Sequence, residues 1–292
     1  MKGDNRAMTQ NPPDWMSEGH TAVITGAAGG IGFETARRFA AAGMNVVLAD
    51  IKDSLAAARD ALIAETGAAD RIMAQACDVS QFAEVEALRD AVLARFGKVH
   101  CLMNNAGIAT RGAPPWEALD GLNHIMGINF MGVVHGCHAF IPSMLAHGEP
   151  GAVINTGSKQ GITRPPGNTA YNLSKAGVVA YTEAVAHGFV AEEDCRLTAH
   201  LLVPAFVYTP MIEAFIPEKP GFAATTEETV DYFMGELNGG SFYIICPDGE
   251  TNRTIDEKRI QWNVDDIIKN RPAMSRWHPA YQAAFKAFME EE

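Results

Sequence analysis

Short apolar runs alternate with amphipathic segments along most of the chain. The runs expected to be strands cover residues 22–24, 45–49, 72–77, 100–103, 152–155, 197–203 and 241–247. Between them, apolar residues recur at helical spacing in segments such as 33–42, 82–96 and 169–189. This alternation predicts an α/β fold with a doubly wound parallel sheet of about seven strands, helices on both faces, and ligands at the carboxyl ends of the strands.

The chain divides into three consecutive segments that differ in their pattern of apolar and polar residues. Residues 1–17 are polar and include Pro12 and Pro13 without an apolar stretch, which predicts a flexible leader and not a secretory signal. Residues 18–247 carry the alternating pattern and are expected to form one domain. Residues 248–292 mix charges with Trp262, Trp277 and Phe285, which predicts a C-terminal extension that docks on its own domain or on a partner subunit.

Composition and charge narrow the class of partner. A net charge of −12 argues against nucleic acid and anionic membrane surfaces, because both are bound by basic patches. The sequence is interpreted as having no apolar stretch of the roughly 20 residues that a transmembrane helix needs. The five cysteines form no Cys-x-x-Cys pair and are interpreted as reduced thiols of a cytoplasmic protein, with no metal site expected.

A glycine-rich turn follows the first predicted strand and begins a predicted helix. Gly26, Gly30 and Gly32 provide backbone freedom and room there, so a pyrophosphate can approach the N–H groups and the positive end of the helix. This is the arrangement of a Rossmann-type dinucleotide site, although the spacing G-x-x-x-G-x-G differs from the generic G-x-G-x-x-G.

Asp50 closes the second predicted strand, about 20 residues beyond the glycine turn, where such folds place an acid on the adenosine ribose. Its carboxylate can accept hydrogen bonds from both ribose hydroxyls, whereas a 2′-phosphate would meet its charge at a cost of about 3 to 4 kcal/mol per charge pair. Asp50 therefore favours NAD over NADP. The alternative is an Asp that only caps the end of a strand.

A candidate catalytic group lies further along the chain. Tyr171 and Lys175 are four residues apart and share one face of a predicted helix, and Ser158 ends an apolar strand upstream. We expect the ammonium group of Lys175 to lie about 4 Å from the tyrosine oxygen and to lower the pKa of Tyr171. Tyr171 would then act as base in alcohol oxidation and as acid in the reverse reaction, with Ser158 holding the substrate oxygen. For each residue taken singly, a structural role explains it as well as a catalytic one. Ser158 can simply end a strand, and Lys175 can be a solvated lysine.

These motifs resemble those of the short-chain dehydrogenase/reductase family, in order and spacing, over roughly residues 18–245. The run from Asn104 to Gly107 after a short strand, and the pair Asp78-Val79, match family motifs. The resemblance implies that Asn129 positions a water molecule in a proton relay and that Lys175 also binds the nicotinamide ribose. One departure is Ala205, which stands where the family usually has glycine, and another is the length of chain beyond the last strand.

The resemblance also implies the residues of the cofactor site and the catalytic group. The expected cofactor contacts are Gly26, Gly30, Ile31, Gly32, Asp50, Asp78, Val79, Asn105, Ala106, Gly107, Tyr171, Lys175, Pro204, Val207 and Thr209. The expected catalytic residues are Asn129, Ser158, Tyr171 and Lys175. A homodimer or homotetramer is expected, with the helices around residues 117–147 and 169–190 as the family's usual interface.

The sequence thus predicts an NAD-dependent oxidoreductase that interconverts a secondary alcohol and a ketone. The expected substrate contacts are Gln160, Ile162, Phe206, Tyr208, Met211 and Phe215. Their apolar and aromatic character favours a bulky hydrophobic or aryl substrate, although core packing explains the same residues equally well. Lys159 is interpreted either as a solvated lysine or as a contact for an anionic substrate group. An NADPH-dependent ketoreductase and a non-catalytic dinucleotide-binding regulatory protein are the alternative functions.

Overall fold

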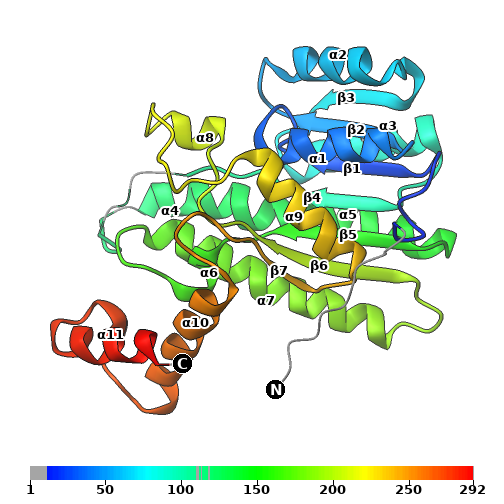
Figure 1. The fold of residues 1–292 in the computed structure, drawn as a ribbon. Coiled ribbons are helices and arrows are strands. Elements are labelled where there is room, and N and C mark those ends of the chain that lie inside the picture. The colour runs from blue at the N-terminus through cyan, green and yellow to red at the C-terminus, as the bar shows by residue number, and fades with distance from the viewer. Residues whose placement is uncertain (1–11, 110–111, 113, 118, 292) are drawn as a thin grey trace.

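The computed structural model describes residues 12–291 except 110, 111, 113 and 118. Its centre is a seven-stranded sheet in the order β3-β2-β1-β4-β5-β6-β7, in which every neighbouring pair is parallel (Figure 1). The strands are β1 (Thr21–Thr25), β2 (Asn45–Asp50), β3 (Ile72–Ala76), β4 (Cys101–Asn104), β5 (Gly151–Thr156), β6 (Leu197–Val203) and β7 (Tyr243–Ile245). Strands are added to one side of β1 as far as β3 and to its other side from β4 onward, and this switch between β1 and β4 opens a crevice at the carboxyl ends of the two strands. The predicted doubly wound α/β fold is confirmed.

Helices cover both faces of this sheet. The helices are α1 (Gly30–Ala41), α2 (Leu55–Thr66), α3 (Phe82–Phe96), α4 (Leu119–Met126), α5 (Gly132–His147), α6 (Lys159–Thr163), α7 (Thr169–Ala191), α8 (Pro210–Glu213), α9 (Thr226–Asn238), α10 (Arg253–Ile268) and α11 (Gln282–Glu290). A π-helical segment, η2 (Gly127–Met131), joins α4 to α5, and the short 3₁₀ turns are η1 (Ala69–Arg71), η3 (Ser275–Trp277) and η4 (Pro279–Tyr281).

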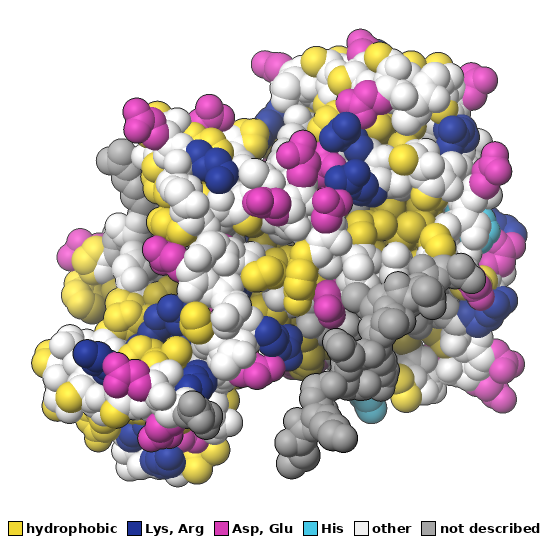
Figure 2. All heavy atoms as spheres, viewed as in Figure 1, with side chains coloured by type: hydrophobic (Ala, Val, Ile, Leu, Met, Phe, Trp, Pro, Cys, Tyr) yellow, Lys and Arg dark blue, Asp and Glu magenta, His cyan; other side chains and the backbone are white. Residues whose placement is uncertain are grey.

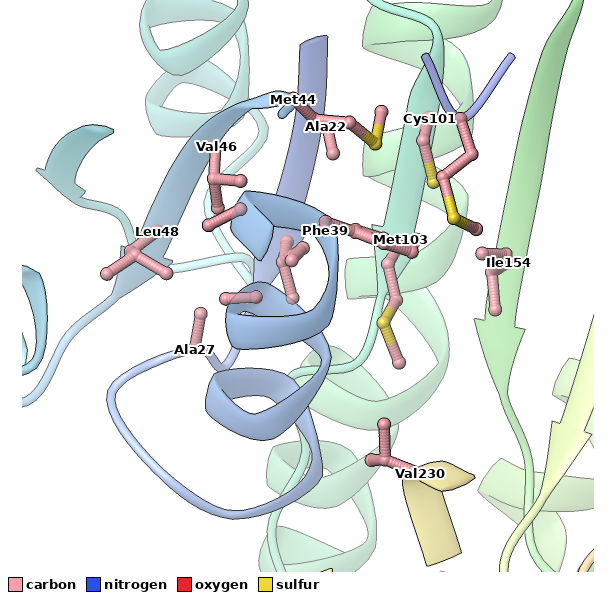
Figure 3. Packing of buried hydrophobic residues seen from close by; sticks show 14 of the residues in the cluster. Ala22, Ala27, Phe39, Met44, Val46, Leu48, Cys101, Met103, Ile154 and Val230 are labelled. Carbon is pink, nitrogen blue, oxygen red and sulfur yellow. The ribbon is translucent and has the colours of Figure 1, made fainter. Parts of the chain in front are cut away.

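Consecutive strand residues supply two separate cores. In β1, Ile24 packs in the core beneath α1 and α9, whereas Val23 packs in the core beneath α3, α5 and α7. This division follows from the strand geometry, which points successive side chains to opposite faces. Figure 3 shows the first core, where Phe39 of α1 and Val230 of α9 meet strand residues such as Met103. Burial on both faces explains why the strands are continuous apolar runs.

The N-terminal boundary of the domain lies before residue 18. Trp15 and Met16 are 4% and 5% exposed and belong to the first core, and the Trp15 ring meets the Phe39 ring edge-on at 5.8 Å. The expected flexible leader of residues 1–17 therefore extends too far, because Trp15 and Met16 at its C-terminal end pack in the first core. The part of the leader that covers residues 1–11 lies outside the described residues.

One apolar stretch that the sequence interpretation overlooked is long enough to cross a membrane by length and composition. It covers Leu119–His147, which the structure folds as α4, η2 and α5. Buried residues of α5, among them Val133, Phe140 and Met144, pack in the second core against the sheet. This packing accounts for the buried part of the stretch.

The C-terminal extension forms a small helical unit of its own. Trp262 of α10 is 4% exposed and contacts the rings of Phe285 and Phe288 at centroid distances of 5.2 and 5.3 Å, while the Arg271 guanidinium lies 3.9 Å from its ring centre. In Figure 1 the extension, coloured orange to red, leaves the domain beside α6.

On the face of the molecule shown in Figure 2, Lys and Arg side chains lie interspersed with Asp and Glu.

A cluster of histidines lies at the amino ends of β1 and β4, opposite the crevice. His100 is 4% exposed; its Nδ1 accepts the N–H of Thr21 at 3.1 Å, which assigns the proton to Nε2, and Nε2 donates to Glu149 at 2.8 Å. His20, His100 and Glu149 bring ligand atoms within 4.8 Å of one another, close enough to share a metal ion. However, the protonated Nε2 of His100 has no lone pair to offer, so hydrogen bonding accounts for this cluster.

We expect the free energy of unfolding to fall on acidification below about pH 6.5, the ordinary pKa of histidine. Burial lowers the pKa of His100, and the neighbouring His20 and His147 add to this, against the effect of Glu149; burial also lowers the pKa of His200. Below pH 6.5 the unfolded chain therefore binds more protons than the folded chain, and stability is lost as the pH falls.

Urea unfolding at pH 7.5 and pH 5.5 measures this effect. His100→Asn, which keeps an acceptor and a donor, should lose less stability between the two pH values than the wild type. His187→Gln, at an exposed histidine, should behave as the wild type does. An equal loss in the wild type and in His100→Asn would contradict the role of His100.

Candidate active site

A cavity of about 320 Å³ opens at the carboxyl ends of the strands, where the crevice is expected. Most of the predicted site residues line it. Those in its wall are Gly26, Gly30, Ile31, Asp50, Asp78, Val79, Asn105, Ala106, Gly107, Ser158, Gln160, Tyr171, Lys175, Pro204, Phe206, Val207, Thr209 and Met211. The fold therefore gathers, at one edge of the sheet, residues that are spread over most of the sequence.

The glycine turn packs tightly against the loop after β4. Gly26 has φ +66°, and a Cβ there would lie 2.7 Å from Ala106 Cα. A Cβ at Gly32 would lie 2.5 Å from the carbonyl oxygen of Gly26. Gly32 thus lets α1 approach the turn closely from behind, and it lies outside the cavity wall. The N-terminus of α1 is left facing the cavity at Gly29 and Gly30.

Asn105 holds the turn and two strand ends together. Its Nδ2 donates to the carbonyl oxygens of Thr25 and Gly26 at 3.1 and 3.2 Å, and its Oδ1 accepts the Thr156 hydroxyl at 3.3 Å. The backbone N–H groups of Asn105 and Ala106 both donate to Thr25 Oγ1. These bonds fix the floor of the cavity across β1, β4 and β5.

Asp50 marks one end of the cavity and is 9% exposed. Its Oδ2 accepts the N–H of Ala28 at 3.0 Å and its Oδ1 accepts the N–H of Lys52 at 3.1 Å. Two wall residues here were not predicted from the sequence, namely Lys52 and Ile51, which is 66% exposed. Their sequence signal was their position directly after the acid that closes β2.

Tyr171, Ser158 and Lys175 converge at the other end. Ser158 forms the N-cap of α6, where its Oγ accepts the N–H of Gln160 at 3.2 Å, and it lies in the cavity wall close to Tyr171. Lys175 is 4% exposed; its Nζ donates to the carbonyl oxygen of Thr156 at 2.7 Å and lies 5.9 Å from the centre of the Tyr171 ring. The predicted spacing on one helix face brings the pair together on α7.

The expected lowering of the Tyr171 pKa is wrong for the protein on its own. Burial raises the pKa of Tyr171, against a smaller lowering by the nearby Ser158 hydroxyl, and burial lowers the pKa of Lys175 to about 8. The sequence argument allowed for the charge of Lys175 but not for the loss of water around both groups, which disfavours each charged form.

Asn129 lies behind the cavity and not in its wall. It is fully buried in η2; its Oδ1 accepts the N–H of Ile108 at 2.8 Å, and its Nδ2 donates to the carbonyl oxygen of Ile108 and to Ser174 Oγ at 3.0 and 3.3 Å. Its side chain therefore holds the loop after β4 against α7, while η2 interrupts the regular α-helical ladder at this point.

Three of the expected substrate contacts also lie outside the cavity wall. Ile162 packs against the second core. The hydroxyl of Tyr208 donates to the carbonyl oxygens of Ile216 and Pro217 at 3.2 and 2.7 Å, and Phe215 is 46% exposed. Gln160, Phe206 and Met211 are in the wall, and the unpredicted Ile108 and Ile212 join them there.

The cavity suits a dinucleotide at three places. The Gly26 turn has no Cβ between it and the loop after β4, the N-terminus of α1 faces the cavity, and the buried Asp50 lies at the end where a ribose would be held. Lys175 lies at the opposite end of the cavity. Thr209 and Pro210 lie over Gly30, and a Cβ added to Gly30 would lie 3.4 Å from Thr209 Cγ2.

Residues 20–220 match the model of the short chain dehydrogenase family. The chain belongs to this family and is an oxidoreductase of its type. It is 32% identical over 249 residues to 1-deoxy-11-beta-hydroxypentalenate dehydrogenase from Streptomyces avermitilis, covering 83% of this chain and 90% of that protein. It is 34% identical over 208 residues to 3beta-hydroxysteroid dehydrogenase 1 from Eggerthella lenta, covering 71% of this chain and 78% of that protein.

A solved structure extends the likeness to three dimensions. It is a short chain dehydrogenase/reductase from Burkholderia phymatum in complex with NAD, with a TM-score of 0.78 and 31% sequence identity. The match covers 87% of this chain and 96% of that one. The sequence-based assignment to the family is confirmed.

Proposed function

We propose that the protein is an NAD-dependent oxidoreductase that interconverts a bulky hydrophobic secondary alcohol and the matching ketone. The observation that carries the proposal is the meeting of Ser158 and Tyr171 in one cavity wall, beside the buried Lys175. A protein that only binds a dinucleotide needs no such group, which is why a purely regulatory role is not favoured.

The chain's residues divide the work of the reaction. NAD, when bound, supplies the hydride acceptor for oxidation, and NADH supplies the donor for reduction. Ser158 Oγ donates a hydrogen bond to the substrate oxygen and orients it. The Tyr171 oxygen takes the proton of the substrate hydroxyl in oxidation and returns a proton to the substrate oxygen in reduction. The ammonium group of Lys175, held by Thr156, favours the phenolate form of Tyr171 at the moment of transfer. Asn129 keeps the loop at Ile108 in place, and in this proposal it also positions the water molecule of the proton relay.

Asp50 supports NAD as the cofactor. Its carboxylate is oriented by two backbone N–H groups, which leaves it unable to turn away from a ribose without losing them. A 2′-phosphate would place a second negative charge against it in a partly buried site. The Burkholderia relative, whose structure contains NAD, supports the same choice.

Lys52 favours NADP as the second candidate. It is exposed and lines the cavity two residues after Asp50, so its ammonium group can approach a 2′-phosphate. The NADPH-dependent ketoreductase is therefore the alternative function. Because the lysine is free to move and the carboxylate is not, Asp50 is expected to dominate.

The side chains around the reacting end support a hydrophobic substrate. Ile108, Phe206, Met211 and Ile212 contribute apolar wall, and Gln160 is a polar group among them. The relatives' names, a hydroxypentalenate and a hydroxysteroid dehydrogenase, support a hydroxyl group carried on a large apolar body.

Absorbance at 340 nm tests the proposal. Purified protein is mixed with NAD⁺ or NADP⁺ and with aryl, aliphatic, steroid and sugar alcohols in turn. Turnover of hydrophobic alcohols with NAD⁺ is expected. Binding of NADH without turnover of any alcohol would favour the regulatory alternative, and a preference for NADP⁺ would favour the ketoreductase.

The proposal includes at least a homodimer, which sedimentation velocity would measure. Exposed apolar residues support it, because Met131 at the end of η2 and Leu173 and Val190 on α7 are 38%, 49% and 84% exposed. They lie within the two segments expected to form the interface.

A further inference from the structure

Lys159 directly follows Ser158 and is neither a solvated lysine nor a contact for an anionic substrate. Its side chain is 17% exposed, and its Nζ lies 2.6 Å from Oδ2 of Asp256, whose side chain is 6% exposed. The same Nζ donates to Thr251 Oγ1 at 2.6 Å. Both partners belong to the C-terminal extension, so the first residue of α6 is bound to a segment about ninety residues further along the chain.

Thr251 continues this connection to the neighbouring loop after β6, whose Pro204 carbonyl oxygen also accepts the Lys159 N–H at 3.4 Å. Its hydroxyl accepts from Lys159 and donates to Asp248 Oδ1 at 2.8 Å. The other carboxylate oxygen of Asp248 accepts the N–H of Phe206 at 3.3 Å. Phe206 lines the cavity on the loop after β6, so an unbroken set of polar contacts runs from the residue after Ser158 to that loop.

A second contact holds the other end of α6. Asn263 of α10 donates from Nδ2 to the carbonyl oxygen of Ile162 at 3.2 Å, where the short helix runs out of internal partners. The five residues of α6 are therefore bound to the extension at both ends. A helix this short is not stable by itself, so its position is set by these contacts together with its close packing on α7 at Gly161.

We propose that Lys159 is a positioning residue which, with Thr251, Asp248 and Asp256, makes the C-terminal extension a clamp on the active site. The clamp fixes Ser158, the N-cap of α6, and Gln160 within α6 relative to Phe206 on the neighbouring loop after β6. The effect of the clamp on kcat rests on the function proposed above, because the clamp keeps Ser158 oriented towards the substrate oxygen. A buried ion pair contributes little net stability by comparison with apolar residues, so stability alone does not account for it.

Lys159→Met tests the clamp, because it keeps the aliphatic stem and removes the charge. We expect kcat to fall by about 10- to 100-fold, the cost of a small misplacement of a reacting group, with the Kd of NADH unchanged within about twofold. Lys159→Arg keeps the charge and the donors and should retain most of the activity. Lys269→Met removes a lysine of the extension whose ion pair, with Asp265 at 2.6 Å, lies within the extension, and it should leave kcat as in the wild type.

Loss of Lys159 also leaves Asp256 buried without its cation, which lowers stability for a reason unrelated to positioning. The double variant Lys159→Met/Asp256→Asn removes that charge and separates the two effects. The clamp predicts that the double variant regains thermal stability but keeps the low kcat. Recovery of both properties would mean that the pair only compensates charge, and would overturn the proposal, as would an unchanged kcat in Lys159→Met.

Hydrogen–deuterium exchange gives a readout that needs no substrate. The clamp predicts faster amide exchange in residues 158–164 and 204–208 of Lys159→Met and of the double variant, but not of Lys269→Met. If no alcohol is turned over by the wild type, the proposed function fails, and exchange alone decides the coupling. Unchanged exchange in both segments would overturn it.

Discussion

Replacing Tyr171 by Phe should lower kcat by about 10²- to 10⁴-fold, the contribution of a positioned acid or base. The phenol oxygen lies close to Ser158 in the cavity wall and is the group placed to exchange a proton with a substrate oxygen that Ser158 holds. Phe keeps the ring that lines the cavity, so NADH should bind as it does to the wild type. Single-turnover measurement of NADH formation, together with NADH fluorescence titration, separates the two effects.

Tyr243→Phe is the matched control for this experiment. Tyr243 also uses its hydroxyl, donating to Glu183 at 2.6 Å, but it lies in the edge strand β7 and outside the cavity wall. Its loss should leave kcat unchanged. A Tyr171→Phe enzyme that retained more than about one tenth of the wild-type kcat would mean that another group transfers the proton.

The pH dependence of the wild type should differ between the two directions. Because burial raises the pKa of Tyr171, the base form needed for oxidation is scarce at neutral pH, and oxidation should accelerate as the pH rises. The acid form needed for reduction is already dominant at neutral pH, so reduction should vary little there.

Replacing Asp50 by Ser should raise the ratio of kcat/KM with NADP⁺ to that with NAD⁺ by about 10²-fold. The repulsion removed is about 3 to 4 kcal/mol per charge pair, and each 1.4 kcal/mol corresponds to about tenfold. Asp50 is 9% exposed and fixed by the N–H groups of Ala28 and Lys52, so in the wild type the charge cannot move aside. After the substitution, Lys52 remains to attract a 2′-phosphate.

Asp53→Ser is the control for Asp50. Asp53 is an exposed acid three residues further along and outside the cavity wall, so its loss changes the net charge equally without changing the ribose site. The cofactor ratio of this variant should equal that of the wild type. If both substitutions shifted the ratio alike, the effect would come from the overall field and not from a contact with the ribose.

The architecture and many residues of the cavity wall were predictable from the sequence. The α3 and β6 boundaries, Phe82–Phe96 and Leu197–Val203, coincide with the predicted ones because apolar periodicity follows directly from helix and strand geometry. The pair Tyr171 and Lys175 was predictable for the same reason, since residues four apart share a helix face. Asp50 and Gly26 were predictable because parallel strands bring their carboxyl ends to one edge of the sheet.

The chemical environment of these residues could be read only from the folded chain. The burial of Trp15, the concealed position of Asn129 and the pairing of Lys159 with Asp256 all depend on segments that are distant in sequence. The direction of the Tyr171 pKa shift likewise depends on how much water the folded chain excludes. Periodicity and spacing are properties of the local backbone, whereas burial and partner choice arise from packing, which no local pattern encodes.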